Sequence, residues 1–213
     1  MSEFMRLKKI KGAEEYVNNS SYTVNDYKDY LGKWKSYFKN DNPIHLEIGC
    51  GKGDFLIGMA KQYKDINFIG IEKYPSVLIK TLQKLENENL ENICFICMDA
   101  SVVDTVFEKE IDILYLNFSD PWPKKKHHKR RLTSPIFLEK YETIFKNEKR
   151  IIMKTDNQDL FEYSLITTTN NDYKIEDISL NLHQTDRFNI KTEYEERWSK
   201  KGYPICYVSL LKK

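Results

Sequence analysis

The chain has 213 residues, of which 40% are apolar and 13% aromatic, and its formal net charge is +2. This length fits one domain with a substantial core, and the near-neutral charge excludes a polycation that binds by bulk attraction. No apolar stretch approaches the length of a membrane span, and the N-terminal residues lack the apolar core of a signal peptide. We therefore expect a cytoplasmic protein with no membrane partner. The sequence leaves open whether it is a monomer or a homodimer.

The beginning of the chain is polar and basic. Residues 1–22 carry little hydrophobic pattern and are predicted to form a basic, mobile N-terminal arm. From Thr23 to Phe38, tyrosine, leucine, tryptophan and phenylalanine recur at helical spacing, which predicts a helix packed on the rest of the protein. The remaining residues, 23–213, are expected to form a single domain.

The spacing of the cysteines does not favour a metal site. Cys94 and Cys97 make a CxxC pair, but both lie in a predicted strand, where their side chains would point to opposite faces. We expect free thiols and no bound metal.

A glycine-rich turn follows the first predicted strand. The segment IHLEIGCGKGDF begins with the strand, and a helix is predicted from Asp54 to Tyr63. Such a turn lets the backbone approach a nucleotide-like ligand closely. The third glycine of the dinucleotide fingerprint would fall at Asp54, so the spacing does not match that fingerprint. Glu47, just before Gly49 and Gly51, favours a ligand with a cationic head over a pyrophosphate, which it would repel.

The next two predicted strands also end in a carboxylate. Glu72 closes the strand from Asn67 to Lys73, and Asp99 lies near the end of the strand from Ile93 to Ala100. An acidic residue at the end of the second strand is placed to accept hydrogen bonds from ribose hydroxyls. This series of strand ends predicts an adenosine-type ligand at one edge of the sheet.

The most informative stretch is FSDPWPKKKHHKRRL, from Phe118 to Leu132. It follows an apolar run typical of a buried strand, and its prolines cannot continue that strand. Asp120 therefore lies where a central strand ends and a stiff loop begins. Six Lys/Arg and two His follow within the same segment. Charge runs are often only solvated surface. A carboxylate and a run of cations in one loop, however, favour a catalytic group next to a segment that binds a polyanion.

The fifth predicted strand, Arg150 to Thr155, leads to Asp156. This residue either caps the helix that follows or lies beside Asp120 at the edge of a parallel sheet. The residues themselves leave both interpretations open.

Two late strands, 173–182 and 203–212, complete the pattern. Between them, Thr192 and Glu195 fit a capping box at the start of a short helix. Strands and helices alternate throughout, without a linker or an internal repeat. The pattern predicts a single doubly wound, Rossmann-like α/β domain with a mostly parallel seven-stranded sheet and helices on both faces.

The segments EIGCGKG and NFSDPWPKKKHHKRRL, with the acidic residues Glu72 and Asp99, resemble the bacterial tRNA (guanine-N7)-methyltransferases. These are class I enzymes that use S-adenosyl-L-methionine. The similarity runs from about Pro43 to the C-terminus and includes KTDN and TEYE. The resemblance implies a class I methyltransferase domain that methylates N7 of a guanosine in the tRNA variable loop, position 46 in tRNA numbering.

The resemblance also implies a role for each matched position. Asp120 would be catalytic. Cofactor contacts would come from Glu47, Gly49, Gly51, Glu72, Asp99 and Asp120. The substrate would contact Lys124, Asp156, Thr192, Glu193, Tyr194 and Glu195. The RNA would contact Lys126, His127, His128, Lys129, Arg130 and Arg131. Family members usually carry arginine where this chain has Lys126, a change that keeps the charge but loses a planar fork.

Guanine N7 carries a lone pair and no proton, so its attack on a sulfonium methyl group requires no general base. Asp120 and Asp156 are the candidates to stabilise the charge that develops on the purine, and Trp122 either stacks on the base or packs the loop. One alternative is an amino-group methyltransferase, although Trp122 separates Pro121 from Pro123, which are usually adjacent in those enzymes. The other is an RNA-binding module with a vestigial nucleotide fold.

Overall fold

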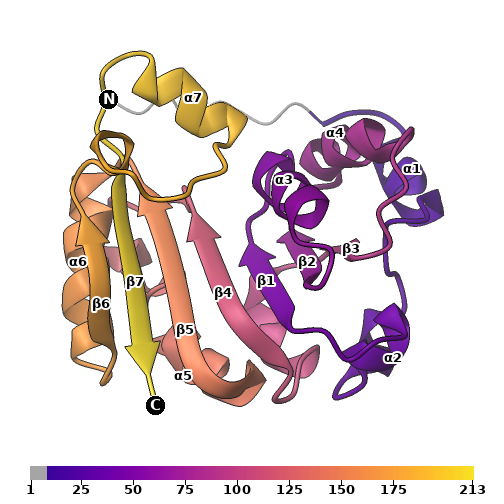
Figure 1. The fold of residues 1–213 in the computed structure, drawn as a ribbon, viewed down its shortest axis with the longest axis horizontal. Helices are drawn as coiled ribbons and strands as arrows, with labels where there is room; N and C mark the ends of the chain where they lie inside the picture. The colour runs from indigo at the N-terminus through magenta and orange to yellow at the C-terminus, as the bar shows by residue number, and fades with distance from the viewer. Residues whose placement is uncertain (1–8) are drawn as a thin grey trace.

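The computed structural model describes residues 9–213, which form a seven-stranded sheet with helices on both faces (Figure 1). The strand order is β3-β2-β1-β4-β5-β7-β6. Only β7 is antiparallel to its neighbours, so the mostly parallel doubly wound sheet is confirmed. The strands are β1 (Ile44–Ile48), β2 (Asn67–Glu72), β3 (Ile93–Cys97), β4 (Ile111–Asn117), β5 (Phe145–Thr155), β6 (Lys174–Ser179) and β7 (Cys206–Lys212).

The α-helices are α1 (Ala13–Asn19), α2 (Trp34–Phe38), α3 (Asp54–Gln62), α4 (Pro75–Leu85), α5 (Pro135–Ile144), α6 (Gln158–Thr169) and α7 (Glu193–Ser199). Short 3-10 helices are η1 (Tyr27–Tyr30), η2 (Ala100–Thr105), η3 (Lys125–Arg130) and η4 (Leu182–Gln184). Alternate strand residues point to opposite faces, so Leu114 packs with α5 and α6 while Tyr115 packs with α3 and α4. Within residues 9–213, no helix is long and apolar enough to cross a bilayer.

The N-terminal region differs from the expected mobile arm over residues 1–22. Residues 1–8 lie outside the described residues. From Ala13 to Asn19, however, the chain forms helix α1, and Ala13 and Val17 are buried in the same cluster as the apolar side of α4. This part of the chain belongs to the folded domain, because its small apolar stripe completes the cover over α4.

The helix expected from Thr23 to Phe38 is also interrupted. Only η1 and α2 form, and Gly32 between them adopts a left-handed φ of 69°. The prediction that this segment packs on the domain is confirmed, because Trp34 is fully buried and its indole Nε1 donates to Val106 O at 2.9 Å.

The strand order reverses at β1. The chain adds β2 and β3 on one side of β1 and then returns to place β4 on the other side. In open α/β sheets, ligands bind outside the carboxyl ends of the strands at such a switch point. Helix α7 lies above the carboxyl ends of β4 and β5 in Figure 1, on the same edge of the sheet as this switch point.

Candidate active site

The centre of the site is a hydrogen-bonded pair at the switch point, Glu47 from β1 and Asn117 from β4. Asn117 Nδ2 donates to Glu47 Oε1 at 2.7 Å, and both side chains are buried. Glu47 Oε2 and Asn117 Oδ1 are buried without a hydrogen-bond partner among residues 9–213. Burial raises the pKa of Glu47 to about 7, although the Asn117 bond and the charge of Lys154 act in the opposite direction. Two unpaired buried acceptors call for a donor, and a cationic group fits best.

The glycine turn connects this pair to the end of β2. Gly49, Gly51 and Gly53 all have left-handed φ values, between 58° and 78°, which side chains other than glycine adopt at a cost. Glu72 accepts hydrogen bonds from Gly51 N at 3.2 Å and Tyr74 N at 2.9 Å. Burial raises the pKa of Glu72 despite these bonds. The turn and Glu72 thus form one preorganised unit.

Asp99 lies at the start of η2, after the end of β3. Its carboxylate pairs with Lys73 Nζ at 2.7 Å and accepts from Ser101 N at 2.8 Å. The Lys73 hydrogen bond lowers the pKa of Asp99 to about 2, so the group stays ionised at neutral pH. Its side chain is about half exposed and remains open to a ligand.

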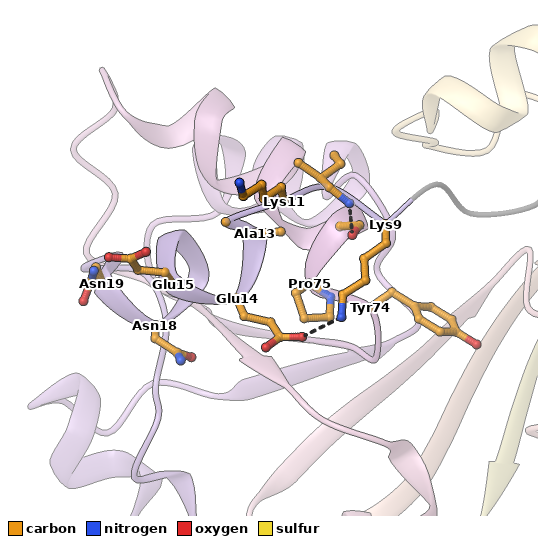
Figure 2. Close-up of a pocket in the computed structure, with 12 residues that line it drawn as sticks. Lys9, Lys11, Ala13, Glu14, Glu15, Asn18, Asn19, Tyr74 and Pro75 are labelled. Carbon is orange, nitrogen blue, oxygen red and sulfur yellow. Dashed lines mark hydrogen bonds and ion pairs between the residues drawn. The ribbon is translucent and has the colours of Figure 1, made fainter.

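A broad hollow of about 980 Å³ lies next to this edge, between α1 and the start of α4 (Figure 2). It is lined by the turn before α1, by α1 itself and by Tyr74, Pro75 and Ser76. Tyr74 lies at its rim, with the ring directed away from α1. The hollow follows from the packing of α1 on α4, and its lining lacks the strand-end carboxylates, so we place the site at the sheet edge instead.

The loop after β4 is strained and braced. Phe118 and Trp122 have φ values of 52° and 42°, which are unusual for bulky side chains and typical of functional sites. Asp120 lies between them with its side chain accessible to solvent, while the surrounding protein desolvates it and raises its pKa. Arg131 holds the loop, because its Nε donates to Pro121 O at 2.8 Å.

The basic segment forms η3 and the residues beside it. Lys126 and Lys129 are exposed, as is Lys124 just before η3. The guanidinium of Arg130 lies 4.9 Å from the Trp122 ring, and the His127 ring lies 6.0 Å from it, so Trp122 packs within the loop. The exposed lysines are available to a polyanion.

Arg131 differs from its neighbours in the basic segment, and the RNA contact expected of it stays a prediction. Its side chain is buried, and its guanidinium lies 4.4 Å from the ring of Tyr163, which in turn packs edge-on against His128. Burial lowers the pKa of Arg131. The residue supports the Asp120 loop through its bond to Pro121. In the sequence, nothing distinguishes this buried arginine from the exposed cations beside it.

Asp156 lies at the carboxyl edge and does not cap α6. Asn157 is the cap, since its Oδ1 accepts from Leu160 N at 2.8 Å. Asp156 Oδ2 instead accepts from Tyr194 Oη at 3.2 Å, and the Tyr194 ring lies 5.2 Å from Phe118. The helix-cap interpretation is therefore wrong, and α7 touches the loop that carries Asp120.

Glu195 lies in the first turn of α7. Thr192 caps α7 as predicted, accepting from Glu195 N at 2.9 Å. The Glu195 side chain is fully buried in this structure, and the substrate contact that the resemblance implies for it stays a prediction. Glu195 pairs with Lys154 Nζ at 2.8 Å, a residue that the sequence interpretation missed. The lysine inside the apolar run RIIMKT could have indicated a buried ion pair, because buried lysines are almost always paired.

Residues 41–208 match the family described as a putative methyltransferase. A tRNA (guanine-N(7)-)-methyltransferase of Oceanobacillus iheyensis is 48% identical over 204 residues, which cover 94% of this chain and 96% of that protein. A protein of the same name from Listeria monocytogenes is 49% identical, over 85% of this chain and 86% of its own. The chain belongs to the tRNA (guanine-N7-)-methyltransferase family.

Solved structures with lower identity show the same fold. An antibiotic-related methyltransferase covers 87% of this chain and 93% of its own, with a TM-score of 0.65 and 16% identity. A variant 16S rRNA (adenine(1408)-N(1))-methyltransferase from Catenulisporales acidiphilia, solved with cosubstrate SAM, has a TM-score of 0.61 and 10% identity. It covers 84% of this chain and 90% of its own. The family and these neighbours agree on a class I methyltransferase fold.

Proposed function

We propose that this chain transfers a methyl group from S-adenosyl-L-methionine to N7 of guanosine at position 46 of tRNA. The observation that carries the proposal is the buried Glu47–Asn117 pair with its two unpaired acceptors, next to the Asp120 loop at the switch point. The names of the relatives support the substrate, and the cosubstrate of the rRNA methyltransferase supports the methyl donor.

The described residues fit this methyl donor. Its ammonium group would satisfy Glu47 Oε2 and Asn117 Oδ1, which have no hydrogen-bond partner among the residues that the structure describes. Glu72 would accept from the ribose hydroxyls, and the open backbone at Gly49 and Gly51 would allow close approach. Asp99 would lie toward the adenine end of the donor, after the end of β3.

S-adenosyl-L-methionine supplies a methyl group on a positively charged sulfur. When guanine N7 attacks, the N7–methyl bond forms, the sulfur–methyl bond breaks, and the positive charge moves onto the purine. No proton leaves, so the site needs a fixed negative charge near the base and no general base. Asp120 would supply that charge from a braced loop, and Asp156 beside Tyr194 would help to orient the guanine edge.

The tRNA would be held mainly through its phosphates. The exposed lysines of the basic segment, at positions 124, 125, 126 and 129, follow directly on the Asp120 loop. Phosphate contacts fix register and orientation without reading sequence. They would therefore bring the variable loop to the edge where Asp120 lies.

The direct test is methyl transfer to bulk tRNA with a methyl-labelled donor, followed by identification of the modified nucleoside by mass spectrometry. We expect 7-methylguanosine at position 46. Methylated adenosine would favour the amino-group alternative. Binding of tRNA without any labelled nucleoside would favour an RNA-binding module.

The affinity for the methyl donor should rise with pH. Glu47 has a pKa of about 7 and must be ionised to accept the ammonium group, so at pH 6 binding requires loss of a proton. Between pH 6 and 7.5 the dissociation constant should fall roughly fivefold to tenfold, as the ionised fraction rises. Isothermal titration calorimetry measures this change. Glu47→Gln should bind more weakly with a flat profile, and an equally steep profile in that variant would exclude Glu47 as the titrating group.

Charge reversal in the basic segment should weaken tRNA binding. Lys125, Lys126 and Lys129 are exposed, and Arg131 is left intact because it supports the loop. Changing these three lysines to Glu should lower affinity roughly tenfold or more and flatten the salt dependence, since fewer counterions are released. Filter binding over a range of salt concentrations measures both quantities.

A matched control reverses three exposed lysines near the amino ends of the strands, Lys64, Lys146 and Lys174. The control changes the net charge by the same amount as the test variant, but at the opposite edge of the sheet. Its affinity for tRNA should therefore stay close to that of the unmodified protein. Equal loss in both triple variants would mean that bulk charge, and not the basic segment, holds the tRNA.

A further inference from the structure

Residues 188–195, which we name the strap, cross the carboxyl edge of the sheet and end in the first turn of α7 (Figure 1). On one side the strap packs against α3. A Cβ added at Gly58 would lie only 2.7 Å from Ile190 Cγ2, so Ile190 occupies the space that the missing side chain leaves. The ring of Phe188 lies 5.9 Å from that of Tyr63, just after α3.

The strap also contacts the glycine turn. Lys52 Nζ lies 2.6 and 2.7 Å from the two carboxylate oxygens of Glu193, and this pair lowers the pKa of Glu193. The Glu193 amide donates to Asp54 Oδ2 at 3.4 Å. These contacts attach the end of the strap to the turn after β1 and to the start of α3.

The third attachment is Lys154, at the end of β5. Its side chain is buried, with the ammonium 5.0 Å from the Phe55 ring and 5.9 Å from the Phe118 ring. The ammonium has three protons to donate, and its partners are Glu195 Oε2 at 2.8 Å, Asn189 Oδ1 at 2.9 Å and Ile190 O at 3.1 Å. All three partners belong to the strap.

Glu195 completes this buried cluster. Its Oε1 lies 2.7 Å from His183 Nε2 and 2.5 Å from Asn189 Nδ2. Burial lowers the pKa of Lys154, and the charge of Glu195 acts against that shift. Burial would raise the pKa of Glu195, but Lys154 and His183 hold it below its ordinary value. A buried charge left without its partner is strongly destabilising, so the strap cannot move away without breaking this pair.

Lys154 also connects to the Asp120 loop. Its carbonyl oxygen accepts from Phe118 N at 2.8 Å, and the Phe118 ring faces Tyr194 on the strap. We propose that Lys154 is a positioning residue whose buried ion pair with Glu195 fixes the strap, and hence Tyr194, over the edge with Asp120 and Asp156. The inference rests on the proposed function, because the positioned groups are those that would orient the guanine.

The first test compares Lys154→Met with the double variant Lys154→Met, Glu195→Gln. The single variant should lose both thermal stability and turnover, because Glu195 remains as an unpaired buried charge. The double variant should regain much of the melting temperature, since no unpaired charge remains. Its turnover at saturating tRNA and methyl donor should nevertheless stay roughly tenfold or more below that of the unmodified protein, because reacting groups tolerate little misplacement. Recovery of turnover together with the melting temperature would reduce the pair to a structural role and overturn the proposal.

The second test moves the strap from its other side. Gly58→Ala adds a methyl group against Ile190 in the middle of α3, where alanine favours the helix. Turnover should fall without loss of stability, while Gln62→Ala, an exposed change in the same helix, should leave it unchanged. Unaltered turnover in Gly58→Ala would also contradict the proposal.

A third measurement does not depend on methyl transfer. Trypsin should cut after Lys191 and Arg197 faster in Lys154→Met and Gly58→Ala than in Gln62→Ala, with the fragments identified by mass spectrometry. Equal rates would show that the strap is not displaced and would overturn the proposal. If the unmodified protein methylates no tRNA, the proposed function fails, and the cleavage rates still report on the strap.

Discussion

A tRNA that carries 7-deazaguanosine at position 46 should bind to this protein and accept no methyl group. The substitution replaces N7 by a carbon atom, so it removes the lone pair that attacks the methyl group. It leaves the Watson–Crick edge and all phosphates unchanged, and phosphate contacts dominate affinity. Transfer should fall to the background of the assay, while the dissociation constant should stay within about twofold of that for normal tRNA.

The measurement pairs labelled methyl transfer with filter binding on the same two tRNAs. A tRNA with 7-deazaguanosine at a guanosine outside the variable loop serves as the control, and it should be methylated normally. Methylation of the position-46 analogue at an ordinary rate would mean that another atom is the acceptor, and chemistry at an exocyclic amino group would then replace the present proposal.

Asp120→Asn should lower turnover roughly a hundredfold or more at saturating tRNA and methyl donor, by analogy with removal of a single charge-stabilising group elsewhere. The substitution keeps the size of the side chain and removes its negative charge. Positive charge on the purine grows only as the new bond forms, so the loss should affect kcat more than binding. The partly desolvated surroundings that raise the pKa of Asp120 also strengthen its field at the base.

Single-turnover kinetics with both substrates saturating measure this effect, and tRNA binding is measured alongside. Asp159→Asn, an exposed change in the first turn of α6 near the same edge, is the control. If turnover at saturation is the same in Asp120→Asn and the control, Asp120 contributes only to binding.

Local pattern was sufficient to predict the carboxyl edge of the sheet. Apolar runs that end near Glu72, Asp99 or Asp120 indicate strand ends directly. The alternation of strands and helices indicates a parallel sheet, in which these ends lie at the same edge. The glycine turn added the position of Glu47. These residues all occur at the edge in the structure, because each is placed by its own strand.

Burial could not be predicted from local pattern, because it depends on contacts distant in sequence. Arg131 reads as one more cation in a basic run, and only Tyr163 and Pro121 show that it faces inward. The capping box explained Glu195 locally, yet its side chain turns toward Lys154, 41 residues away. Helix α1 looked mobile because its buried stripe is only Ala13 and Val17. No periodicity in one segment reveals which surface it will meet.

The left-handed backbone at Phe118 and Trp122 has a consequence for the kinetics of tRNA association. Bulky residues reach this region only when the rest of the fold holds them there, and Arg131 and the Phe118–Lys154 backbone bond do so in the free protein. We therefore expect the loop to keep this shape when RNA binds. Rapid mixing of the protein with tRNA should accordingly give a rate that increases linearly with tRNA concentration, without a plateau set by a slow rearrangement of this loop.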